Sequence, residues 1–231
     1  MTTLFKGASA AALAGTGAVG GIYFGTDLFK AEEVKKVSIS SLIRDANPEK
    51  RLITATTVGD ADWKAAYKAY RERNKGNEKD IWSLKGWSKP VGEVTLTEAT
   101  QEFLSACDSN SKVEVSGKDD PLYQQVLSYC TRNTLVSDLI KERSNGKQQL
   151  DTSSSGSGQE AEWKAAWGVY RTQNSSKGTG KDPWGINNWE TEKTKDVLPS
   201  DYKSKCAERV KKPAHKFDNE DYLNVLAWCT K

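Results

Sequence analysis

The stretch ADWKAAYKAYR at residues 61–71 returns one hundred positions later as AEWKAAWGVYR at residues 161–171. In each stretch, aromatic and small apolar residues recur at spacings of three and four, which mark one face of a helix. The residues on this face are Trp63, Ala66, Tyr67 and Tyr70 in the first stretch, and Trp163, Ala166, Trp167 and Tyr170 in the second. The two stretches therefore predict two related amphipathic helices and point to an internal repeat.

The repeat extends to landmarks on both sides of these helices. Two tryptophans recur at an offset of 102 and two cysteines at an offset of 99. These pairs are Trp82 with Trp184, Trp87 with Trp189, Cys107 with Cys206, and Cys130 with Cys229. Upstream, SSLIR at residues 40–44 resembles SDLIK at residues 137–141. We therefore predict a tandem duplication of a unit of about 99 residues.

The predicted duplication divides the chain into consecutive parts. Residues 1–30 form an N-terminal membrane anchor or signal peptide, and residues 37–133 form the first helical copy. Residues 134–160 hold the start of the second unit and a flexible linker, whose sequence at residues 150–158 is LDTSSSGSG. Residues 161–231 form the core of the second copy.

Two further helices are expected in each copy. A stripe of apolar residues from Leu96 to Cys107 follows the capping-box pattern of Thr95 and Glu98. The last helix of the first copy begins at Asp120 and Pro121, a cap and first-turn pair. The other expected helix starts are Asp60, Leu198 and Asn219. Period-two alternation is brief, so the chain is predicted to be mostly helical.

The four cysteines form two pairs with the same internal spacing of 23 residues, although the sequence between them differs. A zinc site would need more soft ligands than each copy supplies. Buried free thiols are the alternative, but we expect the disulfides Cys107–Cys130 and Cys206–Cys229. Each bond would remove about 3 kcal/mol of unfolded-chain entropy. Because disulfides persist in oxidising compartments, the pairs favour a location outside the cell.

Residues 7–25, GASAAALAGTGAVGGIYFG, carry no charge. About twenty such residues are needed to cross a membrane core, so a single transmembrane helix is expected. A secretory signal peptide is the alternative, but no A-x-A-like cleavage site follows the apolar run. The flanking lysines favour a cytoplasmic C-terminal part, whereas the cysteines favour an extracellular one, which we expect. The predicted fold is mostly α: an N-terminal transmembrane helix followed by two tandem copies of a small disulfide-stapled helical module.

Composition excludes several classes of function. The chain has 231 residues with 34 basic and 31 acidic side chains, so a concentrated basic patch for nucleic acid has no support. The single histidine, His215, excludes multi-histidine metal sites and offers little for a catalytic triad. No P-loop or metalloprotease motif is present. We therefore expect no catalytic residues, no metal and no cofactor.

Two sets of side chains are candidates for binding or chemistry. Loop tryptophans at equal spacing in the two copies could stack on a sugar or anchor a partner, although they could also cap the core. These are Trp82, Trp87, Trp184 and Trp189. Matching carboxylates, such as Asp80 with Asp182, are candidates for a hydrolase. Asn174 begins a glycosylation sequon, which is a weak pattern.

Three features together resemble a known group of proteins. They are the Ala/Gly-rich N-terminus, the WKAAY helix, and the closing triplets Tyr129-Cys130-Thr131 and Trp228-Cys229-Thr230. They resemble the large paralogous families of uncharacterised, membrane-anchored proteins of haemotropic mycoplasmas, here as a tandem-duplicated variant. The resemblance implies a wall-less bacterium on red cells whose divergent paralogues vary the cell surface. It supplies no catalytic residues.

The sequence thus predicts a surface-displayed protein on the cell membrane, for host interaction or antigenic variation. Its expected partners are the membrane, through residues 7–25, and a host cell-surface protein or glycan, but no nucleic acid. A glycan- or peptide-binding module that uses the loop tryptophans is the alternative. A carboxylate-dependent hydrolase has the least support.

Overall fold

The computed structural model describes residues 35–153 and 158–231. The predicted anchor at residues 7–25 lies outside these ranges. Within them, no helix has the length and apolar character that crossing a bilayer requires. Below, the first half denotes residues 37–133 and the second half residues 134–231.

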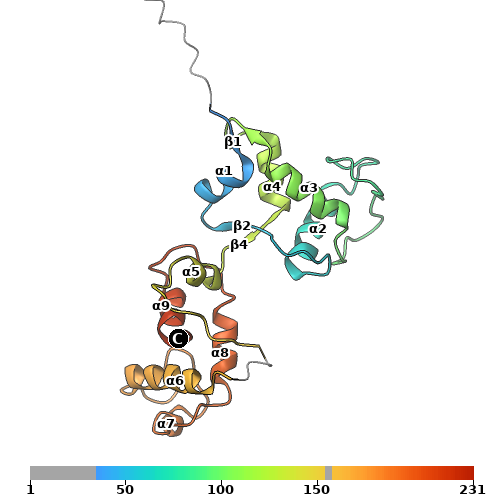
Figure 1. Cartoon of the computed structure of the whole chain (residues 1–231). Helices are drawn as coiled ribbons and strands as arrows, with labels where there is room; N and C mark the ends of the chain where they lie inside the picture. The colour runs from blue at the N-terminus through green and yellow to red at the C-terminus, as the bar shows by residue number, and fades with distance from the viewer. Residues whose placement is uncertain (1–34, 154–157) are drawn as a thin grey trace, which may run out of the picture. The chain divides into compact units, whose positions relative to one another are not determined.

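The first half combines four helices with two small β-ladders (Figure 1). Its elements are β1 (Val37–Ser38), α1 (Ile39–Ala46), β2 (Lys50–Leu52), α2 (Ala61–Arg73), α3 (Gln101–Ser111), β3 (Glu114–Val115), α4 (Pro121–Tyr129) and β4 (Thr131–Asn133). β1 pairs with β3 and β2 with β4, both antiparallel. Each ladder joins the start of the half to a later part, which holds the helices together as one unit.

The second half has the same order of helices with one short helix added. Its elements are α5 (Val136–Glu142), α6 (Glu160–Asn174), α7 (Trp189–Glu192), α8 (Tyr202–Arg209) and α9 (Glu220–Trp228). Single antiparallel bridges join Leu135 to Pro213 and Gln149 to Thr230, where the first half has its ladders. The described residues are thus mostly helical, which confirms this part of the predicted fold class.

Short polar side chains set several helix starts as predicted. The Asp60 carboxylate accepts hydrogen bonds from the N–H groups of Asp62 and Trp63 at the start of α2. Asp120 caps α4, with Pro121 in the first turn, and Asn219 caps α9. These caps satisfy N–H groups that a helix leaves unpaired at its first turn.

The predicted helix start at Thr95 is wrong. α3 begins five residues later, and its N-cap is Thr100, whose hydroxyl accepts a hydrogen bond from an N–H of the first turn. Leu96 is 63% exposed, although the helical spacing assigned it to the buried face. The chain before Thr100 is bound elsewhere, because the Ala99 N–H donates to the Val58 carbonyl at 3.0 Å. A long-range backbone bond therefore overrides the local capping pattern.

Two further differences lie in the second half. The helix expected from Leu198 begins at Tyr202. Leu198 precedes Pro199, and a proline disfavours helical geometry in the residue before it. The predicted loop around Trp189 contains the short helix α7, which follows Asn188 in a left-handed conformation (φ 55°).

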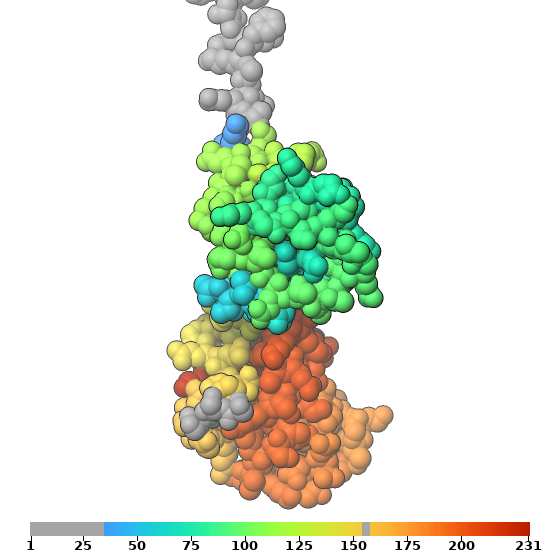
Figure 2. Space-filling model, turned by 90° about the vertical axis from the view of Figure 1, so that its right-hand side faces the viewer, coloured from blue at the N-terminus to red at the C-terminus, as the bar shows by residue number. Residues whose placement is uncertain are grey.

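Each half has its own core of buried aromatic and aliphatic side chains. In the first half, the ring of Tyr70 lies within 4.8–6.0 Å of four other aromatic rings. In the second half, Tyr170 has five such neighbours at 4.9–5.7 Å. Aromatic rings thus supply much of the buried surface in a chain with few aliphatic residues. In the space-filling view, the first half runs from blue to yellow-green and the second half from yellow to red (Figure 2).

The segment that was predicted as a linker begins inside the second core. Leu150 is fully buried, and its N–H donates to the Cys229 carbonyl at 2.9 Å. The equivalent bond in the first half runs from the Ile53 N–H to the Cys130 carbonyl at 3.0 Å. The start of this segment is therefore part of the second half, and residues 154–157 lie outside the described ranges.

The two halves follow each other directly at β4. The Thr134 hydroxyl donates to the Pro48 carbonyl at 2.7 Å, and the Arg132 guanidinium bonds to the Asp138 carboxylate at 2.6 and 2.9 Å. Burial alone would raise the pKa of Asp138, but hydrogen bonds from Arg132 and from the Leu135 N–H lower it. These bonds fix the start of α5 to the end of β4.

Both predicted disulfides are present. Cys107 and Cys130 are joined with 5.5 Å between their Cα atoms, and Cys206 and Cys229 with 5.9 Å. In each half the bond links the third main helix to the C-cap of the last one. All four cysteines belong to the aromatic cores.

Removing either disulfide should destabilise the protein by about 3 kcal/mol, because each bond closes a loop of the same length. The two test proteins carry Cys107→Ala with Cys130→Ala, or Cys206→Ala with Cys229→Ala. Urea unfolding followed by tryptophan fluorescence measures the loss. A loss below about 1 kcal/mol for both variants would contradict a stabilising role for the bonds.

Candidate functional site

A tyrosine in each half bonds to a buried carboxylate. The Tyr70 hydroxyl donates to Asp80, which also accepts the N–H groups of Trp82 and Leu84, both at 2.9 Å. In the second half, the Tyr170 hydroxyl donates to Asp182 at 2.6 Å. These contacts tie the C-terminal part of α2 and of α6 to the loop that follows.

The matching carboxylates that we considered for a hydrolase are therefore placed in the cores. Asp80 and Asp182 are only 4% and 5% exposed. Hydrogen bonds reach both oxygens of Asp80. Those from Tyr170 and the Ile186 N–H reach only the Oδ2 atom of Asp182, and its buried Oδ1 atom has no partner among the described residues. In this conformation they stabilise the loop, and neither presents a face on which a substrate could lie.

A buried asparagine follows each of these tyrosines. The Asn74 and Asn174 amides donate to the carbonyls of Tyr70 and Tyr170, both at 2.8 Å. Asn174, which begins the predicted sequon, is 4% exposed. In the folded chain this amide closes the end of α6 and is not available on the surface.

The four candidate binding tryptophans pack against the cores. Trp184 and Trp189 are buried, and Trp82 and Trp87 are half-buried. The indole N–H of Trp82 donates to Gln125 at 2.7 Å, and those of Trp87 and Trp189 donate to backbone carbonyls at 3.2 and 2.8 Å. Burial leaves Trp184 and Trp189 no ring face for a ligand, so stacking on a sugar is not the role of these two rings.

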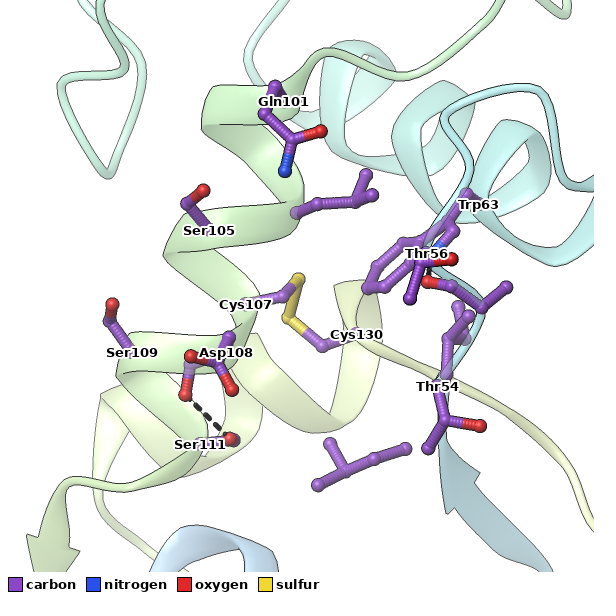
Figure 3. A pocket seen from close by; sticks show the side chains of 14 residues that line it. Thr54, Thr56, Trp63, Gln101, Ser105, Cys107, Asp108, Ser109, Ser111 and Cys130 are labelled. Carbon is purple, nitrogen blue, oxygen red and sulfur yellow. Dashed lines mark hydrogen bonds between the residues drawn. A yellow bond between two sulfur atoms is a disulfide. The ribbon is translucent and has the colours of Figure 1, made fainter.

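The first half contains a groove of about 550 Å³ beside its disulfide. One wall is α3, the other is the chain from β2 to α2, and the Cys107–Cys130 bond lies between them (Figure 3). Apolar side chains and small polar ones line it together. The polar ones are Thr54, Thr56, Gln101, Ser105, Asp108, Ser109 and Ser111. This volume falls within the usual range for ligand sites, about 300–1,000 Å³.

The second wall of the groove, called the strand wall below, continues from β2 as irregular chain after Leu52, and its outer edge has unpaired backbone groups. Ile53 and Ala55 turn toward the interior, because the Ile53 N–H donates to Cys130 and the Ala55 carbonyl accepts the Trp63 indole N–H at 2.7 Å. Along an extended chain, the backbone N–H and C=O groups of successive residues point to opposite sides. The groups of Thr54 and Thr56 therefore point away from the interior. Within residues 35–153 and 158–231, the backbone groups of Thr54 and Thr56 have no hydrogen-bond partner. This edge is open to another strand.

The helix wall presents side chains spaced along one face of α3. Gln101, Ser105 and Asp108 follow helical spacing and all line the groove. Asp108 bonds to the Lys112 ammonium at 2.7 Å, and the Ser111 hydroxyl donates to the Asp108 carbonyl at 2.8 Å. The wall is thus polar, with its one carboxylate paired to a cation.

The groove was not predicted from the sequence. The available signal is the run LITATTV at residues 52–58, which is uncharged and rich in β-branched residues. Such a run is typical of a strand, but it does not tell whether its edge is paired. Among the described residues, no group of three histidine, cysteine or acidic side chains is placed to hold a metal ion.

Three tyrosines should ionise only when the protein unfolds. Burial is the largest cause that raises the pKa of Tyr70, Tyr170 and Tyr202, and the bonds to Asp80 and Asp182 raise it further in the first two. A raised folded-state pKa gives stability that is present below the ordinary tyrosine pKa, about 10, and is lost as the pH rises above it.

Alkaline titration of the phenolate absorbance should therefore show a first phase from exposed tyrosines and a later phase that coincides with loss of helical circular dichroism. Tyr170→Phe serves as a control and should reduce the amplitude of the later phase. A single phase that is complete while the helices persist would contradict the burial of these hydroxyls.

No protein-family model, curated protein or solved structure matches this chain.

Proposed function

We propose that this chain is an exported interaction protein, displayed on the outer face of the cell membrane for host contact or antigenic variation. The observation that carries the proposal is the pair of disulfides, one in each aromatic core. Such bonds form and persist in oxidising surroundings and are rare in the cytosol of mesophiles. A small core with few aliphatic residues gains stability from them.

The proposed anchor is the uncharged segment at residues 7–25. The two halves are proposed to be copies of one module, supported by their matching disulfides and tyrosine–carboxylate bonds. The resemblance to surface families of haemotropic mycoplasmas supports display on a cell that lives on red cells. Two disulfide-bonded modules on one anchor would present two related surfaces to a partner.

Protease treatment of intact cells tests the proposed display. Proteinase K should remove residues 31–231, because they would lie outside the membrane. A cytosolic marker protein in the same cells should stay intact and serves as the control. If the full chain survives treatment of intact cells but is digested after lysis, the proposed orientation is wrong.

A second candidate function is recognition of an extended peptide, and the unpaired edge at Thr54 and Thr56 favours it over glycan binding. A peptide strand that pairs with this edge gains main-chain hydrogen bonds, while side chains of the peptide enter the groove. The uncharged hydroxyls and the amide on α3 would then contact it as polar partners. This role uses the groove in place of the tryptophans.

Substitution of Thr54 by proline tests the peptide-binding candidate. The variant removes an N–H that has no partner within the described residues, so the fold should keep its stability. Peptides selected from a random phage-displayed library on the wild-type C-terminal part, residues 35–231, should bind Thr54→Pro about tenfold more weakly. Thr54→Ala retains the N–H and should bind normally. Equal binding of both variants would contradict strand pairing at this edge.

A further inference from the structure

The two disulfides differ in how they are covered. Cys107 and Cys130 line the groove and are 3% and 1% exposed. Cys206 and Cys229 are 0% exposed. Figure 3 shows the sulfur–sulfur bond of the first half between the helix wall and the strand wall. The first bond is therefore adjacent to open space, whereas the second is enclosed by protein.

Two residues that line the groove in the first half are replaced by different residue types in the second. At the offset of 99, Lys203 stands where the first half has Leu104, and Val210 where it has Ser111. The Lys203 ammonium lies 5.6 Å from the centre of the Trp163 ring, and Val210 is buried in the second core. Two positions that line the groove in the first half are thus occupied in the second half by a long side chain, Lys203, and a buried apolar one, Val210.

We propose that the Cys107–Cys130 disulfide is a thiol-exchange site, reached through the groove by a low-molecular-weight thiol. Exchange requires a thiolate to approach one sulfur of the bond, so the rate depends on access. The groove supplies this access, and its polar lining of hydroxyls solvates an incoming polar thiol. The one carboxylate in the lining, Asp108, is paired with Lys112, which limits its repulsion of an anionic thiolate.

The exchange takes place in two balanced steps. The incoming thiolate attacks one protein sulfur, a mixed disulfide forms, and the electron pair of the broken bond leaves on the other protein sulfur, which takes a proton from water. A second thiolate attacks the small-molecule sulfur of the mixed disulfide. The oxidised small-molecule disulfide is released, and the electron pair of the broken bond leaves on the first protein sulfur, which also takes a proton from water. The protein disulfide gains two electrons and two thiols are oxidised.

The product would be a chain in which only the first half has lost its covalent link between α3 and α4. The second half would keep its disulfide and its core. The groove lies at the released link, so exchange would loosen the wall formed by α3. The inference depends on the coverage of the two bonds and holds whether or not the chain is displayed on the cell surface.

Timed treatment with reduced glutathione tests the proposal. Free thiols are trapped with N-ethylmaleimide at each time, the remaining disulfides are reduced and labelled with the deuterated reagent, and peptide mass spectrometry gives the state of each cysteine. In the folded chain, Cys107 and Cys130 should be reduced about tenfold faster than Cys206 and Cys229. In guanidinium chloride the two bonds should react at similar rates. Equal rates in the folded chain, or faster reaction of the second bond, would overturn the proposal.

A matched pair of variants separates access through the groove from local unfolding. Ser105 is exposed on the helix wall, and Ser105→Trp should block the groove and slow reduction of the first bond at least about threefold. Ser204 is the exposed counterpart in the second half, and Ser204→Trp should leave the first bond unchanged. Circular dichroism confirms that both variants are folded. If Ser105→Trp is folded and reacts at the wild-type rate, the groove is not the route.

Discussion

The covalent link between the third main helix of each half and the C-cap of the last helix is the constraint on which the fold depends. It holds Cys107 beside Cys130, and Cys206 beside Cys229, at positions that also receive a backbone bond from the start of the half. In each half the two helices and the segment that contains Ile53 or Leu150 therefore meet at one point. The aromatic rings fill the space around it, and in the first half the groove lies on its outer side.

The sequence predicted the parts of the fold that depend on local pattern or on recurrence. Helical spacing located α2 and α6, and short polar side chains such as Asp60 and Asn219 marked helix starts that the structure confirms. The cysteine pairs led to the correct disulfides, because the same spacing of 23 residues recurs in both halves. The start of α3 could not be predicted, since Thr95 forms a plausible cap and only the distant bond from Ala99 to Val58 rejects it.

The burial of the loop tryptophans and the position of the groove were harder to predict. Both depend on which distant segments of the chain lie next to a residue and which do not. A tryptophan in a polar loop fits both a binding platform and a core cover, and only the fold shows that Trp184 and Trp189 lie inside. The groove is lined by Thr54 and Ser105, which are about fifty residues apart in the sequence. No spacing rule along the chain connects such residues.

The differences between the halves are more informative about function than their similarities. A disulfide, a buried tyrosine–carboxylate bond and a buried asparagine recur in both halves, so these features maintain the fold and do not distinguish one surface from the other. Lys203 and Val210 stand where the first half has Leu104 and Ser111. At these positions the first half has an open groove, and the second half has the buried Val210 and the half-buried Lys203. If the module was duplicated, one copy is free to carry an accessible strand edge and a reactive bond, because the other retains a protected disulfide and a closed core.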